Sequence, residues 1–336
     1  MKAVGYTRGG DASVLEDVEV PRPTAGARDL LVAIKAVSIN PVDTKVRANA
    51  LPDGADPRIL GWDAAGVVVE AGDDVELFKV GDEVYYSGAI DRPGTNAEYH
   101  LVDERIVGRK PASLGFAEAA ALPLTALTAW ELLFDRLRVD RGDAGRGALL
   151  VVNGAGGVGS ILIQLARRLT GLTVIATASR PDTASWVLKM GAHHVIDHHQ
   201  PLARQVRELG VEAVEYVAGL TGTDRQLPEI AEIIAPQGHL ALVDDVDLAI
   251  GALKPKSVTV SWEMVFTRPL FKTHDLIRQH EILNALAELI DRSEIVTTLT
   301  TEGGPLSTQT LRRAHETIES GASIGKIVLT GFGDGA

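Results

Sequence analysis

The sequence predicts an α/β protein whose main domain is a doubly wound parallel sheet with helices on both faces. Two observations predict this fold class. Apolar, strand-like runs alternate with amphipathic helical stretches from Gly147 to Trp262, which is the pattern of a parallel sheet covered on both sides. The residues before this region differ, because short apolar runs divided by Gly, Pro and Asp turns indicate an all-β unit.

The expected elements of the parallel sheet follow one another at short intervals. Strands are expected at Ala148–Asn153, Thr173–Thr177, His194–Ile196, Ala213–Val217, Leu240–Val243 and Val258–Trp262. Helices are expected at Val158–Thr170, Thr183–Met190, Leu202–Leu209 and Arg225–Ala235. Each of these helices would connect two parallel strands.

The N-terminal unit and the C-terminal tail supply the remaining elements. Strands of the all-β unit are expected at Leu30–Val37, Ala65–Ala71, Asp82–Tyr86 and Ala97–Val102. The tail is expected to form a helix at Leu276–Ile290, a strand at Ile295–Thr298, a helix at Ser307–Ser320 and a last strand at Lys326–Leu329. We expect this tail to return and pack onto the N-terminal unit.

Composition excludes several classes of protein. The 336 residues, 45% hydrophobic and 23% charged, suggest about two ordinary globular domains. The net charge of −12 disfavours nonspecific binding to nucleic acids or anionic membranes, which need a positive surface. Because cysteine is absent, disulfides, thiolate nucleophiles and cysteine-ligated zinc are excluded. With no apolar signal core and no apolar run near about 20 residues, a cytoplasmic protein is expected.

The most informative motif is the glycine-rich turn between the first parallel strand and the first helix. Its glycines stand at Gly154, Gly156 and Gly159, in the spacing Gly-x-Gly-x-x-Gly. The first permits a tight turn, the second lets the backbone approach a pyrophosphate, and the third lets helix and strand pack closely. The helix would begin near Gly157 and Val158 and direct its free N–H groups at the phosphates. The motif therefore predicts a dinucleotide-binding site.

The end of the second strand indicates which dinucleotide binds. NAD sites usually carry Asp or Glu about 20 residues past the glycines, for the ribose 2′-hydroxyl. Here Ser179 and Arg180 stand at that place, and a hydroxyl with a guanidinium suits a 2′-phosphate. Asp182 follows Pro181 and is expected to cap the next helix. The sequence thus predicts NADPH, the alternative being that Arg180 is only a solvated surface arginine.

The chain resembles the medium-chain dehydrogenase/reductase superfamily, specifically its zinc-free quinone-oxidoreductase-like branch, over essentially its whole length. Besides the glycine turn, the segments that carry the resemblance are Ser38–Arg47, Leu60–Val68, Val80–Tyr85, Leu122–Trp130 and Gly325–Leu329. It implies a Rossmann-type doubly wound sheet inserted into a GroES-like β-barrel catalytic domain, with the active site in the cleft between them. It also implies a catalytic domain at 1–123, an NADPH-binding domain at 124–262, a C-terminal return at 263–336, and a homodimer joined at the sheet edges.

The residues at the expected metal position argue against a catalytic metal. Zinc-dependent members of the superfamily place a cysteine where this chain has Asn40, and a His-Glu pair where it has Trp62-Asp63. A catalytic zinc needs about three protein ligands and an open position, so no metal site is expected. The pairs His193-His194 and His198-His199 do not change this, because adjacent strand residues point to opposite faces. His198 would instead lie near the adenosine end of the cofactor.

Three residues are candidates for the chemistry in the cleft. By resemblance, Asn40 would donate to a substrate oxygen or hold the nicotinamide ribose, and Asp43 would relay a proton. The alternatives are a simple turn residue for Asn40 and a cap on the helical turn at Thr44–Arg47 for Asp43. Trp62, together with Tyr86, would form an apolar wall for a flat substrate, with core packing as the alternative for both.

The resemblance also implies further contacts with the cofactor. Thr125 and Thr128 lie three apart on one face of the helix that leads into the cofactor domain, and resemble threonines that touch the nicotinamide. The other expected contacts come from the last strands of the cofactor sheet and from the C-terminus: Leu242, Val243, Phe266, Arg268 and Lys326. Packing is the alternative for the threonines, and a surface position for the lysine.

The predicted function is NADPH-dependent, zinc-independent transfer of hydride to quinones or α,β-unsaturated carbonyls. No residue stands out as a general acid, and such acceptors need little acid help because hydride addition yields a stabilised phenolate or enolate. Cofactor positioning and proximity would supply much of the rate. Two alternatives remain open: an enoyl-thioester reductase of the same superfamily, and a non-catalytic NADPH-binding protein.

Overall fold

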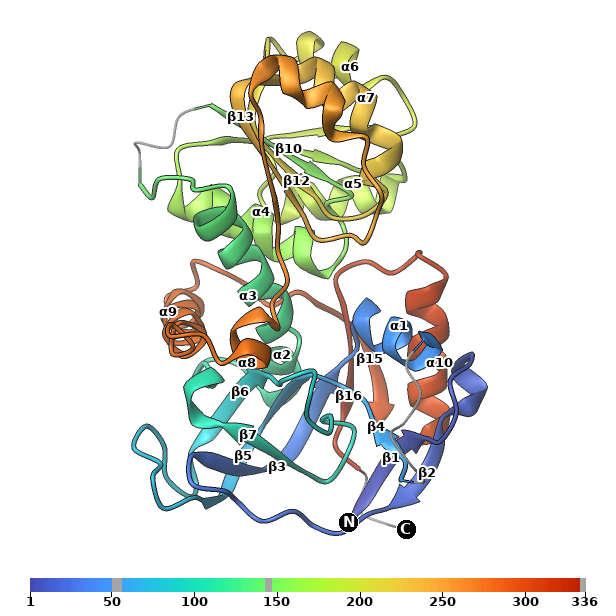
Figure 1. Ribbon diagram of the computed structural model, residues 1–336, viewed down its shortest axis with the longest axis vertical. Helices are drawn as coiled ribbons and strands as arrows, with labels where there is room; N and C mark the ends of the chain where they lie inside the picture. The colour runs from blue at the N-terminus through green and yellow to red at the C-terminus, as the bar shows by residue number, and fades with distance from the viewer. Residues whose placement is uncertain (50–55, 143–146, 333–336) are drawn as a thin grey trace. The chain divides into compact units, whose positions relative to one another are not determined.

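The chain folds into two compact units (Figure 1). The computed structural model describes residues 1–49, 56–142 and 147–332. Unit 1 comprises Met1–Leu127 and Phe266–Ala336, whereas unit 2 is the continuous stretch Thr128–Val265. Unit 2 is therefore inserted between the two parts of unit 1, and the boundaries expected after residues 123 and 262 lie a few residues earlier.

Unit 2 is built on a six-stranded sheet in which every pairing is parallel, in the order β11-β10-β9-β12-β13-β14. Its strands are β9 (Ala148–Val152), β10 (Thr173–Thr177), β11 (His194–Ile196), β12 (Val214–Gly219), β13 (Ile234–Leu242) and β14 (Thr259–Trp262). Its helices are α4 (Gly157–Leu169), α5 (Pro181–Lys189), α6 (Leu202–Glu208) and α7 (Thr223–Ile233), with a 3₁₀ helix at Ile250–Lys256. This arrangement confirms the predicted doubly wound parallel sheet.

The sequence forms this sheet because its central strands are apolar on both faces. Every residue of β9 is buried, and α4 packs its apolar face on the sheet while Arg167 and Arg168 stand in its last turn, where the helix dipole favours cations. The chain adds β10 and β11 on one side of β9 and β12 to β14 on the other. The carboxyl ends of β9 and β12 therefore form a topological switch point, which is where such sheets bind ligands.

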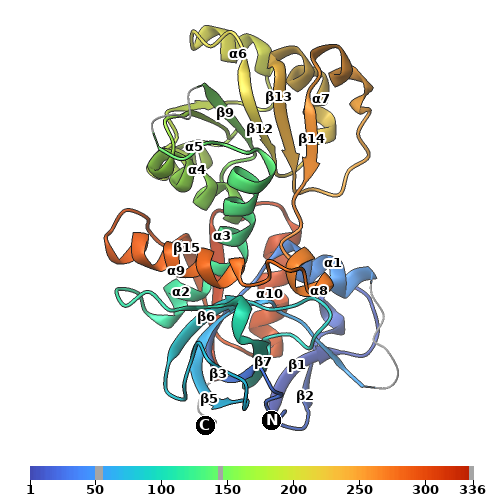
Figure 2. The ribbon, with the colours of Figure 1, turned by 60° about the vertical axis from the view of Figure 1, so that its left-hand side comes forward.

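Unit 1 contains a larger and a smaller sheet (Figure 2). The larger has the order β15-β16-β3-β5-β6-β8, with β7 also paired to β3, and the smaller has the order β2-β1-β4. The strands are β1 (Lys2–Tyr6), β2 (Glu16–Glu19), β3 (Asp29–Ser38), β4 (Arg58–Ile59), β5 (Asp63–Ala71), β6 (Glu83–Ser87), β7 (Tyr99–Asp103), β8 (Val107–Arg109), β15 (Leu299–Pro305) and β16 (Lys326–Thr330). With the parallel sheet of unit 2, this β-rich unit confirms the predicted fold class.

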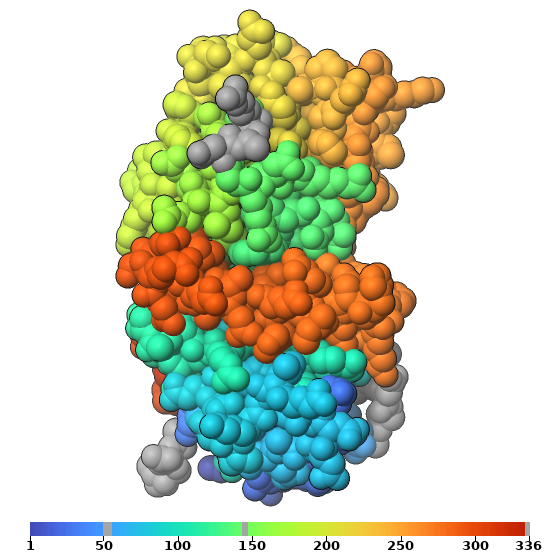
Figure 3. All heavy atoms as spheres, turned by 90° about the vertical axis from the view of Figure 1, so that its left-hand side faces the viewer, coloured from blue at the N-terminus to red at the C-terminus, as the bar shows by residue number. Residues whose placement is uncertain are grey.

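The C-terminal segment returns to unit 1, as predicted. Strand β16 pairs antiparallel with β3, so that Val328 lies opposite Ser38. The helices of unit 1 are α1 (Pro41–Asn49), α2 (Phe116–Ala120), α8 (Thr267–Phe271), α9 (Arg278–Asp291) and α10 (Thr308–Glu319), and α3 (Pro123–Trp130) crosses the boundary between the units. Helix α9 packs on the edge of the larger sheet, where the Tyr85 hydroxyl donates to the Leu283 carbonyl at 2.6 Å, and its outer surface is visible in Figure 3.

Two local predictions are wrong. Residues 295–298 do not form a strand, because Thr297 and Thr298 donate their hydroxyls to carbonyl oxygens of Glu118 and Ala121 at 2.9 and 3.1 Å, and β15 begins only after them. Asp182 is not the cap of α5, because the helix already begins at Pro181, whose fixed φ suits the first helical position.

The N-terminus of α5 is held by a different side chain. The Thr183 hydroxyl accepts the N–H of Arg180 at 3.2 Å, while Asp182 accepts the N–H of Thr183 at 2.8 Å within the first turn. Among the described residues, no helix combines the length and the apolar character that a membrane crossing requires.

Candidate active and cofactor-binding sites

The turn after β9 in unit 2 has the form of a phosphate-binding loop. Its left-handed residue is Asn153, at φ 59°, rather than one of the glycines. The Asn153 N–H donates to Thr177 Oγ1 at 2.8 Å, and its side-chain amide donates to the Thr221 carbonyl at 2.5 Å. Asparagine tolerates this conformation better than most other residues. The turn is thus tied to β10 and to the segment after β12.

The three glycines of the motif differ in what surrounds them. A Cβ on Gly159 would lie 2.4 Å from the carbonyl oxygen of Gly154, and a Cβ on Gly154 would lie 3.1 Å from the Cβ of Ala176. A Cβ on Gly156 would meet no described atom within 4 Å. Gly156 also precedes the first residue of α4, Gly157. Close packing therefore accounts for two glycines, and the open space at Gly156 fits a pyrophosphate against the helix N-terminus.

Polar side chains border the carboxyl ends of β10 and β11. Ser179 is half-buried just after β10, and Arg180 is exposed, with Nε 3.4 Å from Oδ1 of Asp182. His198 follows β11, and its Nδ1 lies 3.4 Å from Thr177 Oγ1. The fold thus brings Ser179, Arg180 and His198 to the same end of the sheet as the phosphate loop.

The residues predicted at the end of β13 lie at this end of the sheet as well. Leu242 is fully buried, and the Val243 N–H donates to the Gly219 carbonyl at 2.9 Å. The next residue, Asp244, accepts the backbone N–H and the hydroxyl of Thr223 at 3.0 and 3.2 Å. Asp244 therefore caps the N-terminus of α7 and fixes that helix beside the switch point.

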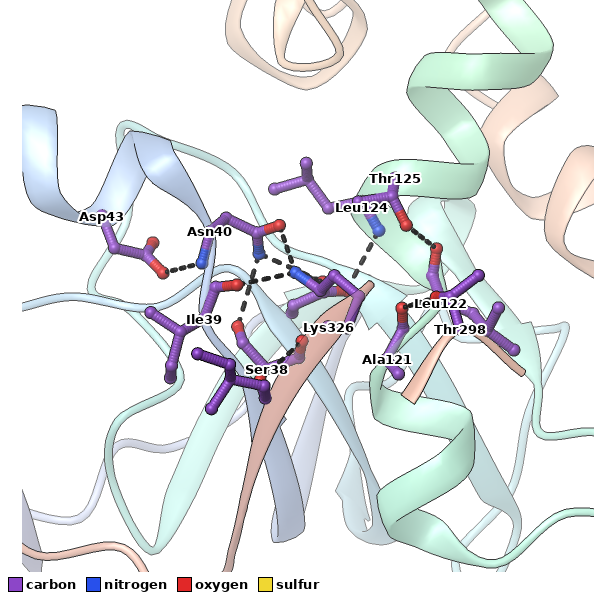
Figure 4. Close-up of polar contacts among 12 residues, drawn as sticks. Ser38, Ile39, Asn40, Asp43, Ala121, Leu122, Leu124, Thr125, Thr298 and Lys326 are labelled. Atoms are coloured by element: carbon purple, nitrogen blue, oxygen red, sulfur yellow. Dashed lines mark hydrogen bonds and ion pairs between the residues drawn. The ribbon is translucent and has the colours of Figure 1, made fainter. Parts of the chain in front are cut away.

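A buried polar cluster in unit 1 joins Asn40, Asp63 and Lys326 (Figure 4). The Lys326 Nζ donates to Asn40 Oδ1 at 2.5 Å and to the Ile39 carbonyl at 2.7 Å, and lies 3.4 Å from Asp63 Oδ2. The side-chain amide of Asn40 donates to Asp63 Oδ2 at 3.1 Å and to the Ser38 carbonyl at 3.3 Å. Both hydrogens of that amide are therefore already donated within unit 1.

Asp63 extends the cluster to helix α3. Its second oxygen, Oδ1, accepts the backbone N–H of Leu124 at 3.0 Å. Because α3 begins at Pro123, this N–H belongs to the first turn, where backbone donors lack partners within the helix and a carboxylate is favoured by the dipole. One buried carboxylate thus serves both the ammonium of Lys326 and the end of a helix.

Asp43 lies at the start of α1, next to this cluster. Its Oδ2 accepts the backbone N–H of Asn40 at 2.8 Å, whereas its Oδ1 is buried and has no hydrogen-bond partner among the described residues. Burial raises the pKa of Asp43 to about 7, although the Asn40 N–H and the charge of Lys326 act in the opposite direction. One oxygen therefore has the capping role, and the other is left to hold a proton near neutral pH.

Burial also acts on the ion pair of the cluster. It raises the pKa of the Asp63 carboxyl and lowers the pKa of the Lys326 ammonium, although each charge favours the ionisation of the other. Together with the neighbouring Asp43, the cluster has two carboxyl groups and one ammonium. A proton on Asp43 would therefore make it electrically neutral, which is the favoured state for buried charges.

The predicted aromatic wall is buried inside unit 1. Trp62 is 0% exposed, its indole N–H donates to the Ala89 carbonyl at 3.1 Å, and its ring meets Phe266 edge-on with centroids 5.8 Å apart. Tyr86 is also 0% exposed and stacks on His100, whose Nδ1 lies 3.1 Å from the tyrosine hydroxyl. Both side chains have the packing contacts of core residues.

The remaining predicted contacts lie on α3 and α8. Thr125 and Thr128 are each 3% exposed, and the Thr125 hydroxyl donates to the Leu122 carbonyl at 3.1 Å. Arg268 is 8% exposed, and its guanidinium contacts the Asp275 carboxylate, with Nε and Nη2 each 3.0 Å from Oδ2.

The residues at the metal position that the family resemblance implies do not fit zinc. Asn40 gives its amide oxygen to Lys326, and the indole of Trp62 is a donor only, so Asp63 remains as one carboxylate where about three ligands are needed. The ammonium of Lys326 would also repel a metal cation. Elsewhere in the described parts of the chain, no group of three or more His, Cys, Asp or Glu side chains is placed to hold a metal.

Sequence reasoning missed two candidate residues. For Asp63 the only signal in the sequence was that the Trp62-Asp63 pair stands where zinc-dependent members of the superfamily have a His-Glu pair. Arg225 stands in the first turn of α7 and is close enough to His198 to lower the pKa of that imidazole. The helix was expected to begin at Arg225 itself, so the residue looked like an ordinary helix terminus.

The sequence resembles known dehydrogenases and reductases along its whole length. Residues 26–129 match the alcohol dehydrogenase GroES-like domain, and residues 190–329 match the zinc-binding dehydrogenase family. A zinc-type alcohol dehydrogenase-like protein of Staphylococcus aureus is 40% identical over 339 residues, which is 98% of this chain and 99% of the relative. The chloroplastic NADPH-dependent alkenal/one oxidoreductase of Arabidopsis thaliana is 37% identical over 207 residues, which is 59% of this chain and 52% of the relative.

Solved structures agree over the same length. A putative zinc-dependent alcohol dehydrogenase from Rhizobium etli is 52% identical, with a TM-score of 0.96 over 99% of this chain and 98% of that one. Escherichia coli quinone oxidoreductase complexed with NADPH is 27% identical, with a TM-score of 0.84 over 98% of this chain and 100% of that one. The chain therefore belongs to the medium-chain dehydrogenase/reductase superfamily, a family of oxidoreductases.

Proposed function

We propose that the protein is an NADPH-dependent oxidoreductase that transfers hydride to quinones or α,β-unsaturated carbonyl compounds without a metal. The observation that carries this proposal is the buried ammonium of Lys326, bonded to Asn40 and paired with Asp63 at the place of the relatives' metal ligands. Because these residues do not fit a zinc ion that could polarise a substrate carbonyl, they favour hydride acceptors that need little activation. The names of the Escherichia coli and Arabidopsis thaliana relatives support the same acceptor classes.

Several features of unit 2 support the choice of NADPH. The pyrophosphate would lie against Gly156 and the first-turn N–H groups of Gly157 and Val158, and the 2′-phosphate beside Ser179 and Arg180. Bound NADPH supplies the hydride. The further cofactor contacts that we propose are Thr125, Thr128, His198, Leu242, Val243, Phe266 and Arg268. Lys326 would act on the site indirectly, through Asn40 and Asp63, because its ammonium donates to Asn40 and to the Ile39 carbonyl and pairs with Asp63.

Within unit 1, Asp43 is the group that we propose to hold the proton. Reduction of a quinone or an enone requires one proton for each hydride, and a carboxyl whose pKa is raised to about 7 can carry it at neutral pH. Asn40 positions this carboxyl through its backbone N–H and positions Lys326 through its side-chain oxygen. Trp62, next to Asp63 in the sequence, packs edge-on against Phe266 and donates its indole N–H to the Ala89 carbonyl.

Steady-state oxidation of NADPH in the presence of a metal chelator tests the proposed function. With one quinone and one conjugated enone as acceptors, we expect turnover that survives chelation and is faster with NADPH than with NADH. Turnover that chelation abolishes and zinc restores would contradict the metal-free assignment. Tight NADPH binding without reduction of either acceptor would favour the non-catalytic alternative.

The Arg180→Ala variant tests the choice of coenzyme. We expect its Kd for NADPH to rise about 10- to 30-fold with little change for NADH, because a charge-assisted contact with a phosphate is worth about 1.5–2 kcal/mol at a partly exposed site. Fluorescence titration of both coenzymes measures this. Arg204→Ala is the matched control, since Arg204 is also an exposed arginine of unit 2 and, among the described residues, forms its ion pair with Glu208, at 3.6 Å. Unchanged NADPH binding would leave Arg180 as a solvated surface arginine, and equal weakening of both coenzymes would remove it from the 2′-phosphate site.

A further inference from the structure

Three nitrogen-bearing side chains from three segments of unit 2 lie near one another at the carboxyl end of the sheet. They are Arg180 after β10, His198 after β11 and Arg225 in the first turn of α7. Both arginines lie close enough to act on the charge of His198. We call them the Arg180–His198–Arg225 cluster. Only the first two were expected from the sequence.

Arg225 is held near the phosphate loop by its backbone. The segment before it is bonded to the loop through Asn153, whose side-chain amide donates to the Thr221 carbonyl. The guanidinium folds back over this segment, since a Cβ on Gly222 would lie 2.6 Å from Nη2 of Arg225. The next residue, Gln226, donates its side-chain amide to the His198 carbonyl at 3.0 Å. These contacts fix the start of α7 against the loop that carries His198.

His198 is enclosed by groups from each neighbouring segment. On its own loop it faces Asp197 and the ring of His199, whose centroid is 4.5 Å away, and from β10 it faces the hydroxyl of Thr177. The charges of Arg180 and Arg225 face it from the segments after β10 and at the start of α7. Burial first, and then His199 and the two arginines, lower the pKa of His198, while Asp197 raises it. The imidazole of the free protein is therefore neutral at pH 7.5.

A phosphate dianion reverses this balance. A phosphate group carries about −1.5 to −2 charges at neutral pH, which compensates the two guanidinium groups and favours a third cation between them. We propose that the Arg180–His198–Arg225 cluster receives the 2′-phosphate of NADPH and that His198 takes up a proton from solvent when it does. This rests on the proposed use of NADPH. Its consequence is a coenzyme preference that shifts further toward NADPH as the pH falls toward neutrality.

Calorimetric titration at pH 7.5 in two buffers of different ionisation enthalpy measures the proton taken up or released on binding. A 2′-phosphate, with a second pKa of about 6, is almost fully ionised there and can only lose its remaining protons on meeting cations. Proton uptake must therefore come from the protein. We expect net uptake with NADPH and none with NADH. Zero uptake or net release with NADPH would overturn the proposal.

Two variants identify the group that takes up the proton. His198→Gln should abolish the uptake, whereas His194→Gln should retain it, because His194 is equally half-buried on β11 but stands at the opposite end of that strand. Uptake that persists in His198→Gln would overturn the assignment. If the unaltered protein bound NADPH no more tightly than NADH, the proposed function and this inference would both fail. If it turned over with NADPH but showed no uptake, only the inference would fail.

Arg225→Ala tests the third member of the cluster. We expect the Kd for NADPH to rise about 3- to 10-fold while the Kd for NADH stays the same, on the scale of a partly screened charged contact. Arg204→Ala serves again as the control. A Kd for NADPH that does not change, or an equal change for both coenzymes, would remove Arg225 from the phosphate site.

Discussion

The Lys326→Met variant is expected to lose about 3–5 kcal/mol of the free energy of unfolding at pH 7.5, the usual cost of removing one partner of a buried ion pair. Methionine fills a similar volume but leaves the Asp63 carboxylate without its cation, with Asp43 as a second buried carboxyl beside it. Asn40 also loses the donor to its side-chain oxygen. Urea unfolding monitored by fluorescence measures the difference.

Lys110→Met is the matched control for this experiment. The Lys110 side chain is only 5% exposed, but its carboxylate partner, Glu83, is 52% exposed and stays solvated when the lysine is removed. We expect a loss of about 1 kcal/mol from this variant. An equal loss from both variants would show that the buried carboxylates do not depend on Lys326.

The effect of Lys326→Met should also depend on pH. Without the ammonium, the pKa values of Asp63 and Asp43 rise further above the ordinary value of 3.8, so the folded state binds more protons than the unfolded state. The variant is then destabilised as the pH rises above about 4, and its deficit against the unaltered protein shrinks as the pH falls toward 4. A deficit that is constant between pH 4 and 8 would contradict this origin.

Replacing Gly159 with alanine is expected to abolish measurable NADPH binding and to destabilise unit 2 by a few kcal/mol. The Cβ of the alanine would lie 2.4 Å from the carbonyl oxygen of Gly154. Because this oxygen belongs to the backbone, it cannot turn aside as the end of a flexible side chain could. The phosphate loop or α4 must therefore move. NADPH titration and thermal unfolding of the variant measure the two effects.

Two further glycines separate loss of fold from loss of binding. Gly156→Ala meets nothing within 4 Å, so we expect normal stability with weakened NADPH binding, because the new methyl group occupies space proposed for the pyrophosphate. Gly251→Ala in the same unit also meets nothing within 4 Å and lies outside the phosphate loop, so it should change neither quantity. Normal NADPH binding by Gly156→Ala would contradict the assignment of this loop.

The parallel sheet was the most predictable part of the fold because its central strands are buried on both faces. Such strands are continuous apolar runs in the sequence, and β10 and β11 have the predicted bounds. Strand β15 was not predictable in this way. It is largely exposed and contains Gly303 and Gly304, so neither burial nor β-propensity marks it, whereas the β-branched run before it gave a false signal.

The candidate site was predictable as individual residues, not as a set of contacts. The family resemblance named Asn40, Asp43 and Lys326, but Asn40 and Lys326 are 286 residues apart and nothing local in the sequence indicates that they bind each other. Asp63 acquires its place only when β5, β16 and α3 have assembled around it. Arg225 likewise matters because of tertiary packing next to His198, which no local motif marks.

The position of β16 also sets the order in which the protein can be completed during synthesis. Unit 2 is a continuous stretch and is available as a whole before residue 266 has been made, whereas the larger sheet of unit 1 lacks β16 until residues 326–330 leave the ribosome. Lys326 lies in that last strand. Until Lys326 has been made, Asp43 and Asp63 have no cation to pair with when they leave water, so burial of these two carboxyl groups depends on one of the last strands of the fold.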